Sequence, residues 1–340
     1  MSRRKTLSSI VALIAISAVI STLRLSLYSA SLKIPELQAR ASTSLAPTVA
    51  SDESKNATFV YLVTRHAYAQ QLPESLHFLH ENWLRRYPLP VTVFYTVEAD
   101  VQLETLNNAT RSLRKRVEVN LVAFNDSVPS FLSDISDTHC ICCCNNLTAP
   151  SRTGIRGGHY SLSYCAMNRF RTLTMYRHSA LASFKYFIQL DTDLYIRKPM
   201  PYDPLVNMTR FRGVFGFAEK SVLEDETQDC NAGLYEAIEG YIAHHQLHPK
   251  FKPARGTSYA GNFNIGDLDF LRSREYYAFA LWINNDVRGI WTHRWGDQAF
   301  IPNVVGIYFD ETRHLHFEDL YNEGIVVHKS ESLGRKLYEP

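Results

Sequence analysis

The chain has 340 residues, of which 45% are hydrophobic and 21% are charged. This composition is typical of a globular protein and excludes a largely disordered chain, a collagen and a small disulfide-rich knot. The formal net charge is only +2, and no Lys/Arg-rich face is visible in the sequence, so we expect no nucleic-acid partner.

The first sixty residues indicate a membrane anchor. An uncharged, mostly apolar run at residues 7–23 follows Arg3, Arg4 and Lys5. As a helix the run would span about 26 Å, close to the thickness of a thin bilayer, and the basic flank places the N-terminus in the cytosol. We predict a cytosolic tail (1–6), a signal-anchor transmembrane helix (7–23), a flexible luminal stem (24–57) and a folded luminal domain (58–340). The alternative is a signal peptide cleaved near Ser29-Ala30-Ser31.

Glycosylation sequons and cysteines favour the same luminal compartment. Five Asn-x-Ser/Thr sequons predict glycosylated surface positions, at Asn56, Asn108, Asn125, Asn146 and Asn207. Four of the six cysteines fall within residues 140–144, and the other two are Cys165 and Cys230. Zinc binding is one interpretation, but zinc sites use wider spacings such as C-x2-C. We therefore predict disulfide bonds, whose pairing the sequence leaves open.

The luminal part alternates strands with helices. Apolar runs predict strands at 59–64, 91–95, 117–124 and 186–190, and helical periodicity predicts helices at 73–86, 101–115 and 164–178. Residues 126–158 are expected to be irregular. This order predicts an α/β fold with a mixed, mostly parallel central sheet.

A pair of aspartates directly follows the predicted strand 186–190, at Asp191-Thr-Asp193. Ligands of open α/β sheets bind at the carboxyl ends of the strands. Carboxylates this close repel each other, and a divalent cation compensates their charge. Such a cation can neutralise the diphosphate of a nucleotide sugar as the glycosyl bond breaks. A helix cap or turn is the structural alternative, and we prefer a capping role for the second such motif, Asp267-Leu-Asp269.

Two blocks of sequence resemble the fungal Golgi α-1,2-mannosyltransferase family, glycosyltransferase family 15. The first is Ser163-Tyr-Cys-Ala-Met-Asn-Arg-Phe170, which leads through Tyr176-Arg-His178 to the aspartate pair. The second is Gly261-Asn-Phe-Asn-Ile-Gly-Asp-Leu-Asp-Phe-Leu-Arg-Ser273 with His293-Arg-Trp-Gly-Asp-Gln298. The resemblance covers roughly residues 57–330.

The resemblance implies a GT-A-like fold and a type II membrane protein of the Golgi, or of the ER, with a luminal catalytic domain. It implies an α-mannosyltransferase that uses GDP-mannose and Mn²⁺, and that transfers mannose with retention to a mannose hydroxyl of a glycoprotein or glycolipid glycan. The sequence departs from the family at two positions. Asp191-Thr-Asp193 stands where the family usually has a Glu-Pro-x sequence, and Asn264 replaces a Glu that is a candidate nucleophile. Asn cannot form a glycosyl ester, so we favour a front-face mechanism in which Asn264 acts as a dipole.

Further site residues are predicted around the aspartate pair. Asp297, in Arg-Trp-Gly-Asp, is a candidate for acceptor binding or acid/base catalysis, with a helix N-cap as the alternative. His328, after the apolar run 325–327, is the preferred third metal ligand, and His316 and His314 are further candidates. Donor or acceptor contacts are assigned to seven residues: Arg65, Tyr164, Asn168, Arg169, Asp191, Asn262 and Trp295.

Two alternatives remain open from the sequence. A GT-A enzyme that uses a UDP-sugar such as UDP-galactose fits the Asp-x-Asp form. A catalytically inactive relative that binds glycans in the secretory pathway fits the absence of the Glu at position 264.

Overall fold

A computed structural model describes residues 56–64, 66–96, 103–125, 162–222, 233–286, 289–292 and 295–328. All of these ranges belong to one compact unit, Ala50–Pro340. Among the helices in the described ranges, none has the length and apolarity needed to cross a membrane. The predicted tail, anchor and nearly all of the stem lie outside these ranges, as do Arg65 and every cysteine except Cys165.

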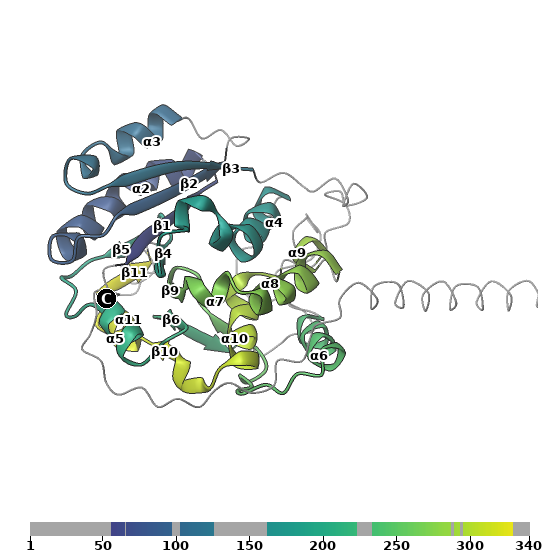
Figure 1. Ribbon diagram of the computed structural model, residues 1–340. Coiled ribbons are helices and arrows are strands. Elements are labelled where there is room, and N and C mark those ends of the chain that lie inside the picture. The colour runs from purple at the N-terminus through teal and green to yellow at the C-terminus, as the bar shows by residue number, and fades with distance from the viewer. Residues whose placement is uncertain are drawn as a thin grey trace, which may run out of the picture. The chain divides into compact units, whose positions relative to one another are not determined.

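The core of the fold is a seven-stranded sheet in the order β10-β6-β9-β4-β1-β2-β3 (Figure 1). Its strands are β1 (Ala57–Val63), β2 (Val91–Thr96), β3 (Val119–Phe124), β4 (Tyr186–Leu190), β6 (Phe215–Phe217), β9 (Phe263–Asp267) and β10 (His314–His316). Only β9 is antiparallel to its neighbours β4 and β6, and the other pairs are parallel. The predicted mixed, mostly parallel sheet is therefore confirmed.

Two short antiparallel pairs complete the strands. They are β5 (Leu194–Ile196) with β11 (Val326–His328), and β7 (Lys220–Val222) with β8 (Thr257–Tyr259). The first pair continues directly from β4, and it brings the end of the described chain back to the carboxyl end of that strand.

Helices and single helical turns connect the strands. The α-helices are α2 (His66–Leu79), α3 (Leu103–Thr110), α4 (Leu162–Arg169), α5 (Pro204–Arg210), α6 (Leu234–His244), α7 (Leu268–Leu271), α8 (Arg274–Leu281), α9 (Gly289–Thr292), α10 (Asp297–Tyr308) and α11 (Glu318–Asn322). The π-helical turns are η2 (His80–Leu84), η5 (Phe170–Thr174) and η8 (Trp282–Asp286), and the 3₁₀ turns are η3 (Leu113–Lys115), η6 (Met175–Arg177), η7 (Ser179–Leu181) and η9 (Glu311–Arg313).

Alternation along β4 divides the interior into two cores. Phe187 packs in a core with residues of α4, α6, α8 and α10, whereas Ile188 packs in a second core with α2, α5 and α11. Successive strand residues point to opposite faces, so Gln189 lies on the same face as Phe187. All five residues of β4 are buried, which is expected of a central strand covered on both sides.

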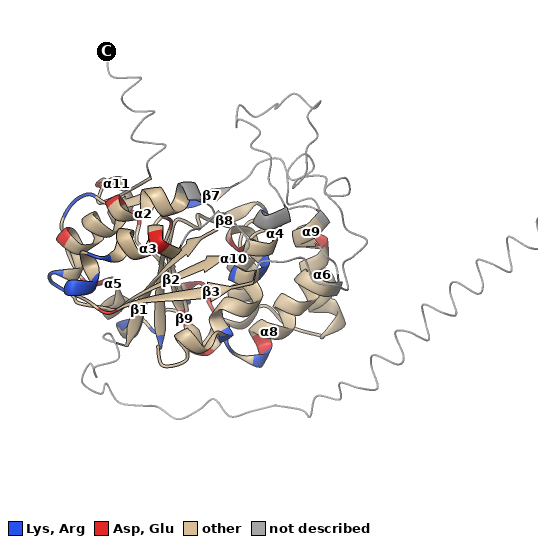
Figure 2. Cartoon of the chain, turned by 90° about the horizontal axis from the view of Figure 1, so that it is seen from above, with Lys and Arg blue, Asp and Glu red and all other residues tan. Residues whose placement is uncertain are grey.

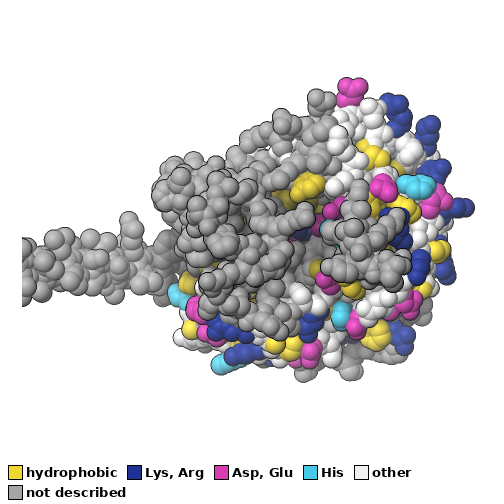
Figure 3. All heavy atoms as spheres, turned by 180° about the vertical axis from the view of Figure 1, so that it is seen from behind, with side chains coloured by type: hydrophobic (Ala, Val, Ile, Leu, Met, Phe, Trp, Pro, Cys, Tyr) yellow, Lys and Arg dark blue, Asp and Glu magenta, His cyan; other side chains and the backbone are white. Residues whose placement is uncertain are grey.

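The strands of this sheet contain almost no charged residues. Among the residues of its seven strands, Asp267 at the end of β9 is the one Asp, Glu, Lys or Arg. Figure 2 accordingly shows acidic and basic residues mainly on helices and loops. On the described part of the face in Figure 3, side chains of both signs are intermingled.

The predicted elements agree with the structure in order and type, and β4 agrees in both of its limits. The predicted helix 73–86 begins earlier, at His66, and the predicted helix 164–178 is divided into α4, η5 and η6. The predicted capping role of Asp267 is confirmed, because its carboxylate accepts a hydrogen bond from the Asp269 amide at 2.8 Å. Cys165 is fully buried and disulfide-bonded, and its partner lies outside the described ranges.

A glycine in β9 permits the close packing of β4 against its neighbours. Gly266 pairs with Phe187 and Phe215, and a Cβ at this position would lie 2.2 Å from Phe187 Cε1 and 2.7 Å from Leu271 Cδ1. We expect Gly266→Ala to lower the free energy of unfolding by about 1–3 kcal/mol, because the core must shift to admit the methyl group. Chemical denaturation measures this change.

Gly240 in α6 is the matched control. A Cβ there would meet Trp282 Cζ2 at 3.7 Å, an ordinary contact. Gly240→Ala should raise the free energy of unfolding by about 0.5–1 kcal/mol through helix propensity. Equal effects of the two substitutions would contradict the role assigned to Gly266.

Candidate functional site

Three candidate metal ligands meet where β4 ends. Asp191 follows β4, Asp193 precedes β5, and His328 is the last residue of β11, where it pairs with Leu194. One ligand atom from each of Asp191, Asp193 and His328 lies within 4.8 Å of the others. His328 Nε2 is 3.3 Å from Asp193 Oδ1. Two carboxylates and an imidazole form a donor set that suits a divalent first-row cation.

Backbone and side-chain hydrogen bonds hold the turn that carries the aspartates. The Asp191 amide donates to the carbonyl of Asn262 at 3.1 Å, and the Leu194 amide donates to the carbonyl of Asp191 at 3.1 Å. Thr192 Oγ1 donates to Gln71 Oε1 of α2 at 3.1 Å. The turn is therefore tied both to the segment before β9 and to the first helix of the domain.

The electrostatics of this group favour a cation. Partial desolvation by the surrounding protein raises the pKa of Asp191, and the charges of Asp193 and Asp297 raise it further, whereas Arg171 and His328 oppose the rise. The side chains of Asp191, Asp193 and His328 are 40%, 27% and 24% exposed, so solvent and a ligand can reach them. A cation would relieve the repulsion between the carboxylates.

Beside the metal-ligand group lies a buried arginine that the sequence analysis missed. Arg171 Nε is 2.8 Å from Gln189 Oε1 and 3.1 Å from Asp297 Oδ2. Its Nη2 donates to the carbonyl of Gly261 at 2.5 Å and lies 3.5 Å from Asp191 Oδ1. The Arg171 side chain is only 6% exposed. A signal was available, because Met167, Arg171 and Met175 follow helical spacing, and a charge within an apolar stripe indicates a buried partner.

Asp297 is not the helix cap considered as an alternative. The N-cap of α10 is Gly296, and Asp297 is the first helical residue. Its side chain is 4% exposed and pairs with Arg171. The carboxylate therefore neutralises a buried guanidinium, which explains an acidic residue here without capping.

Asn264 lies on the same face of the sheet as Gln189. The two residues pair across β9 and β4, and Asn264 is 2% exposed. Within the described residues, its Oδ1 is buried without a hydrogen-bond partner. An unsatisfied buried acceptor costs about 1–3 kcal/mol, so this oxygen is available to a donor from water or a ligand.

Other predicted contact residues surround this centre. The backbone carbonyl of Asn262 accepts a hydrogen bond from the Asp191 amide, and the side-chain Nδ2 of Asn262 is 3.4 Å from Glu219 Oε2. Asn168 is 2% exposed, and its Nδ2, which lacks a partner among the described residues, faces Gly296. Arg169 Nε is also buried without a described partner, and Trp295 is 2% exposed in the core. Arg65 and the side chain of Tyr164 lie outside the described part of the structure.

Two candidate histidines lie apart from the metal-ligand group as the structure defines it. His316 in β10 stacks on Phe217 at 4.8 Å between ring centroids, and its Nδ1 is 4.0 Å from Glu318. His314 is 9% exposed and bonded through Nδ1 to the Tyr259 hydroxyl at 2.8 Å. The strand β10 lies at the sheet edge, three strands away from β4, which explains why neither joins Asp191 and Asp193.

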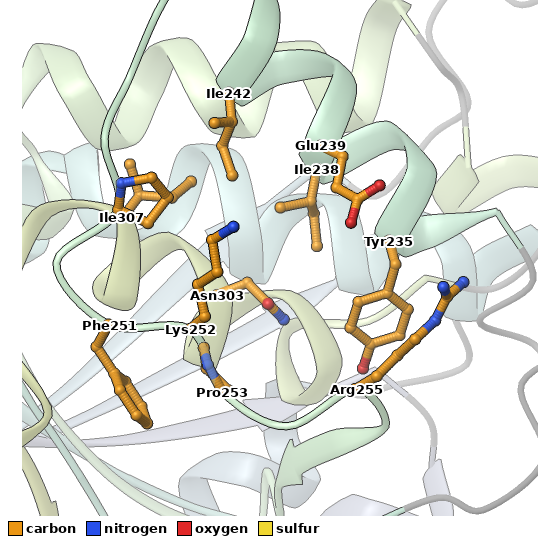
Figure 4. Close-up of a pocket in the computed structure, with 11 residues that line it drawn as sticks. Tyr235, Ile238, Glu239, Ile242, Phe251, Lys252, Pro253, Arg255, Asn303 and Ile307 are labelled. Atoms are coloured by element: carbon orange, nitrogen blue, oxygen red, sulfur yellow. The ribbon is translucent and has the colours of Figure 1, made fainter.

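A separate pocket of about 130 Å³ lies between α6, the loop 249–255 and α10 (Figure 4). Its walls combine Tyr235, Phe251 and three isoleucines with Glu239 and Lys252. None of the predicted site residues lines it. The pocket is therefore not part of the arrangement around Asp191.

The buried state of His314 predicts a pH dependence of stability. Burial, with a smaller contribution from the charge of Lys220, lowers the pKa of His314 to about 4 from its ordinary value of 6.5. The unfolded state therefore binds the proton first as the pH falls. His314 contributes stability above pH 6.5, and we expect up to about 3 kcal/mol to be lost as the pH falls toward 4.

The experiment measures the free energy of unfolding between pH 4 and 7. His314→Gln should flatten the profile, because Gln can keep a hydrogen bond to Tyr259 without titrating. His316→Gln, in the same strand, controls for the loss of a histidine. An unchanged slope in the His314 variant would show that other groups cause the pH dependence.

Comparison with known proteins identifies related mannosyltransferases. A family model described as glycolipid 2-alpha-mannosyltransferase matches residues 27–327. The probable mannosyltransferase KTR2 of Saccharomyces cerevisiae is 21% identical over 79% of this chain, and the match covers 66% of that protein, just under two thirds. O-glycoside alpha-1,2-mannosyltransferase homolog 4 of Schizosaccharomyces pombe is 22% identical over 82% of this chain and 71% of its own length.

Solved structures share the fold. Core-mannan synthase A from Aspergillus fumigatus, in its Mn/GDP form, aligns with a TM-score of 0.63 at 20% identity, over 83% of this chain and 80% of its own. The mannosyltransferase Ktr4p from S. cerevisiae aligns with a TM-score of 0.64 at 19% identity, over 83% and 75%. The predicted GT-A-like α/β fold is thus confirmed. Because the family model covers nearly the whole chain, this protein belongs to the glycolipid 2-alpha-mannosyltransferase family, glycosyltransferase family 15.

Proposed function

We propose that this chain transfers mannose from GDP-mannose, with retention, to a mannose hydroxyl of a glycoprotein or glycolipid glycan. The observation that carries the proposal is the group of Asp191, Asp193 and His328 at the carboxyl end of β4, in a chain of this family. The Mn/GDP form of core-mannan synthase A and the GDP complex of Ktr4p support the choice of metal and nucleotide.

Mn²⁺ is the proposed cofactor, held by Asp191, Asp193 and His328. When bound there, the cation supplies positive charge that offsets the charge of the departing diphosphate. The carboxylates provide hard oxygen ligands and His328 a nitrogen ligand, as Mn²⁺ accepts. The partial exposure of all three side chains leaves room for a nucleotide to approach.

The reaction that these residues support has no covalent glycosyl-enzyme. The amide of Asn264 cannot form a glycosyl ester. The bond from C1 of mannose to the diphosphate oxygen breaks, and a bond from C1 to the acceptor oxygen forms on the same face. The acceptor proton passes to the departing diphosphate oxygen. Asn264 Oδ1, which is buried and unpaired among the described residues, is suited to stabilise positive charge that develops at the sugar.

Asp297 has no proton-transfer role in this proposal. Its carboxylate is 4% exposed and occupied by Arg171, so an acceptor hydroxyl would have to displace a buried ion pair to reach it. Contacts to donor and acceptor are assigned, as the sequence predicts, to seven residues: Arg65, Tyr164, Asn168, Arg169, Asp191, Asn262 and Trp295.

We also propose a type II topology in the Golgi membrane, with residues 7–23 as anchor, 24–57 as stem and 58–340 as luminal catalytic domain. The basic flank and apolar run support the anchor. The exposed positions of Asn56, Asn108 and Asn125 suit glycosylation, and the disulfide at Cys165 suits an oxidising lumen.

Substitution of the metal ligands provides the first test. Asp193→Asn and His328→Ala should each weaken Mn²⁺ binding, measured by calorimetry, at least about tenfold and reduce mannose transfer in parallel, since each removes one ligand. Asp269→Asn, in the second Asp-x-Asp motif, is the matched control and should change neither quantity. Wild-type Mn²⁺ affinity in both ligand variants would contradict the site.

A donor panel provides the second test. We expect the chain to hydrolyse or transfer from GDP-mannose in the presence of Mn²⁺, and not from UDP-galactose or other UDP-sugars. Turnover of a UDP-sugar without turnover of GDP-mannose would replace the proposed donor. Binding of glycans without turnover of any nucleotide sugar would indicate an inactive relative.

A further inference from the structure

We infer that Arg171 is a positioning residue that fixes Asp191 for cation binding, with Asp297 as its counter-charge. The inference rests on the proposed function, because it concerns the metal-binding side chains. Arg171 reaches the metal-binding side chains at Asp191, whose Oδ1 lies 3.5 Å from its Nη2. We assign its effect on the metal site to this contact.

Arg171 is anchored mainly by groups other than Asp191. Its Nε lies 2.8 Å from Gln189 Oε1 and 3.1 Å from Asp297 Oδ2, and its Nη2 lies 2.5 Å from the Gly261 carbonyl. The contact from Nη2 to Asp191 Oδ1 is longer, at 3.5 Å. The contacts to Gln189, Asp297 and Gly261 therefore fix the position of the guanidinium. Its longer contact with Asp191 can orient that carboxylate and still leave carboxylate oxygens to bind a cation.

Charge balance supports Asp297 as the counter-charge of Arg171 and Asp191 as a cation ligand. Asp297 is as buried as Arg171, at 4% and 6% side-chain exposure, and a buried guanidinium requires a nearby anion. Because Asp297 neutralises Arg171, the negative charge of Asp191 is not required for that purpose and can contribute to binding a cation. Without Asp297, Asp191, the other carboxylate in contact with Arg171, would have to neutralise the guanidinium, and less of its charge would be left for a cation.

Arg171 also fixes the backbone of Asp191. Gly261, whose carbonyl accepts from both Arg171 and Gln189 Nε2, is followed by Asn262, whose carbonyl accepts from the Asp191 amide at 3.1 Å. A Cβ on Gly261 would lie 3.1 Å from Arg171 Nη1 and 3.0 Å from Gln298 Nε2. The glycine allows this close approach, so that one guanidinium sets both the carboxylate and the main chain of Asp191.

Two variants test whether Arg171 orients Asp191 for Mn²⁺ binding or only stabilises the fold. Arg171→Lys keeps the charge but loses the planar fork that reaches several partners at once. Arg171→Gln combined with Asp297→Asn removes both charges, so that no unpaired ion is buried. Both should fold, as circular dichroism and thermal unfolding would show. Both should bind Mn²⁺ about 10–100-fold more weakly by calorimetry, with a matching fall in kcat and little change in KM for the acceptor.

Arg272 provides the matched control. It donates to the carbonyls of Leu268, Leu181, Ala182 and Phe184, and in these contacts it has no link to the metal ligands. Arg272→Lys should lower stability while leaving Mn²⁺ affinity unchanged. If both Arg171 variants fold and bind Mn²⁺ with wild-type affinity, the positioning role is wrong.

The two proposals fail in distinguishable ways. Wild-type protein that binds Mn²⁺ but transfers no mannose would overturn the proposed reaction, while the Mn²⁺ affinities of the Arg171 variants would still decide the positioning role. Wild-type protein that binds no Mn²⁺ at all would overturn both.

Discussion

The constraint on which the site depends is the neutralisation of one buried guanidinium. Arg171 lies in η5, inside the core between the helices and the sheet, where an unpaired charge would be strongly destabilising. Its partners come from the end of β4, the segment before β9 and the start of α10. Satisfying this one charge therefore requires three separate parts of the chain to meet at the carboxyl end of β4.

The sheet topology brings the remaining parts to the same place. The antiparallel strand β9 sets Asn264 opposite Gln189, and the short pair β5–β11 returns the end of the described chain so that His328 lies beside Asp193. Each of these pairings joins residues more than seventy positions apart. The carboxyl end of a central strand is where ligands of α/β sheets bind, and here it collects two carboxylates, an imidazole and two buried amides.

The carboxylates in this region fall into two groups with different surroundings. Asp191 and Asp193 are partly exposed, and Asp193 lies beside His328, whereas Asp297 is buried and paired with Arg171. The position where the family resemblance leads one to expect a glutamate holds Asn264, which pairs with the neutral Gln189. Negative charge thus gathers at the candidate metal site, and Asn264 contributes a neutral dipole from β9, which is consistent with the proposed departure of the diphosphate.

Local pattern alone determined much of this molecule. The mostly apolar run 186–190 predicted both limits of β4, because a central strand buried on both faces is largely apolar, and the aspartates after it marked the candidate metal site. The capping role of Asp267 was also readable, since capping depends on neighbours in sequence. The sequence favoured His328 as the third ligand, and the structure groups it with the aspartates. Tertiary structure alone decided the ion pair of Arg171 with Asp297 and the pairing of Asn264 with Gln189. These features depend on strand order and register, which join residues that no local periodicity relates.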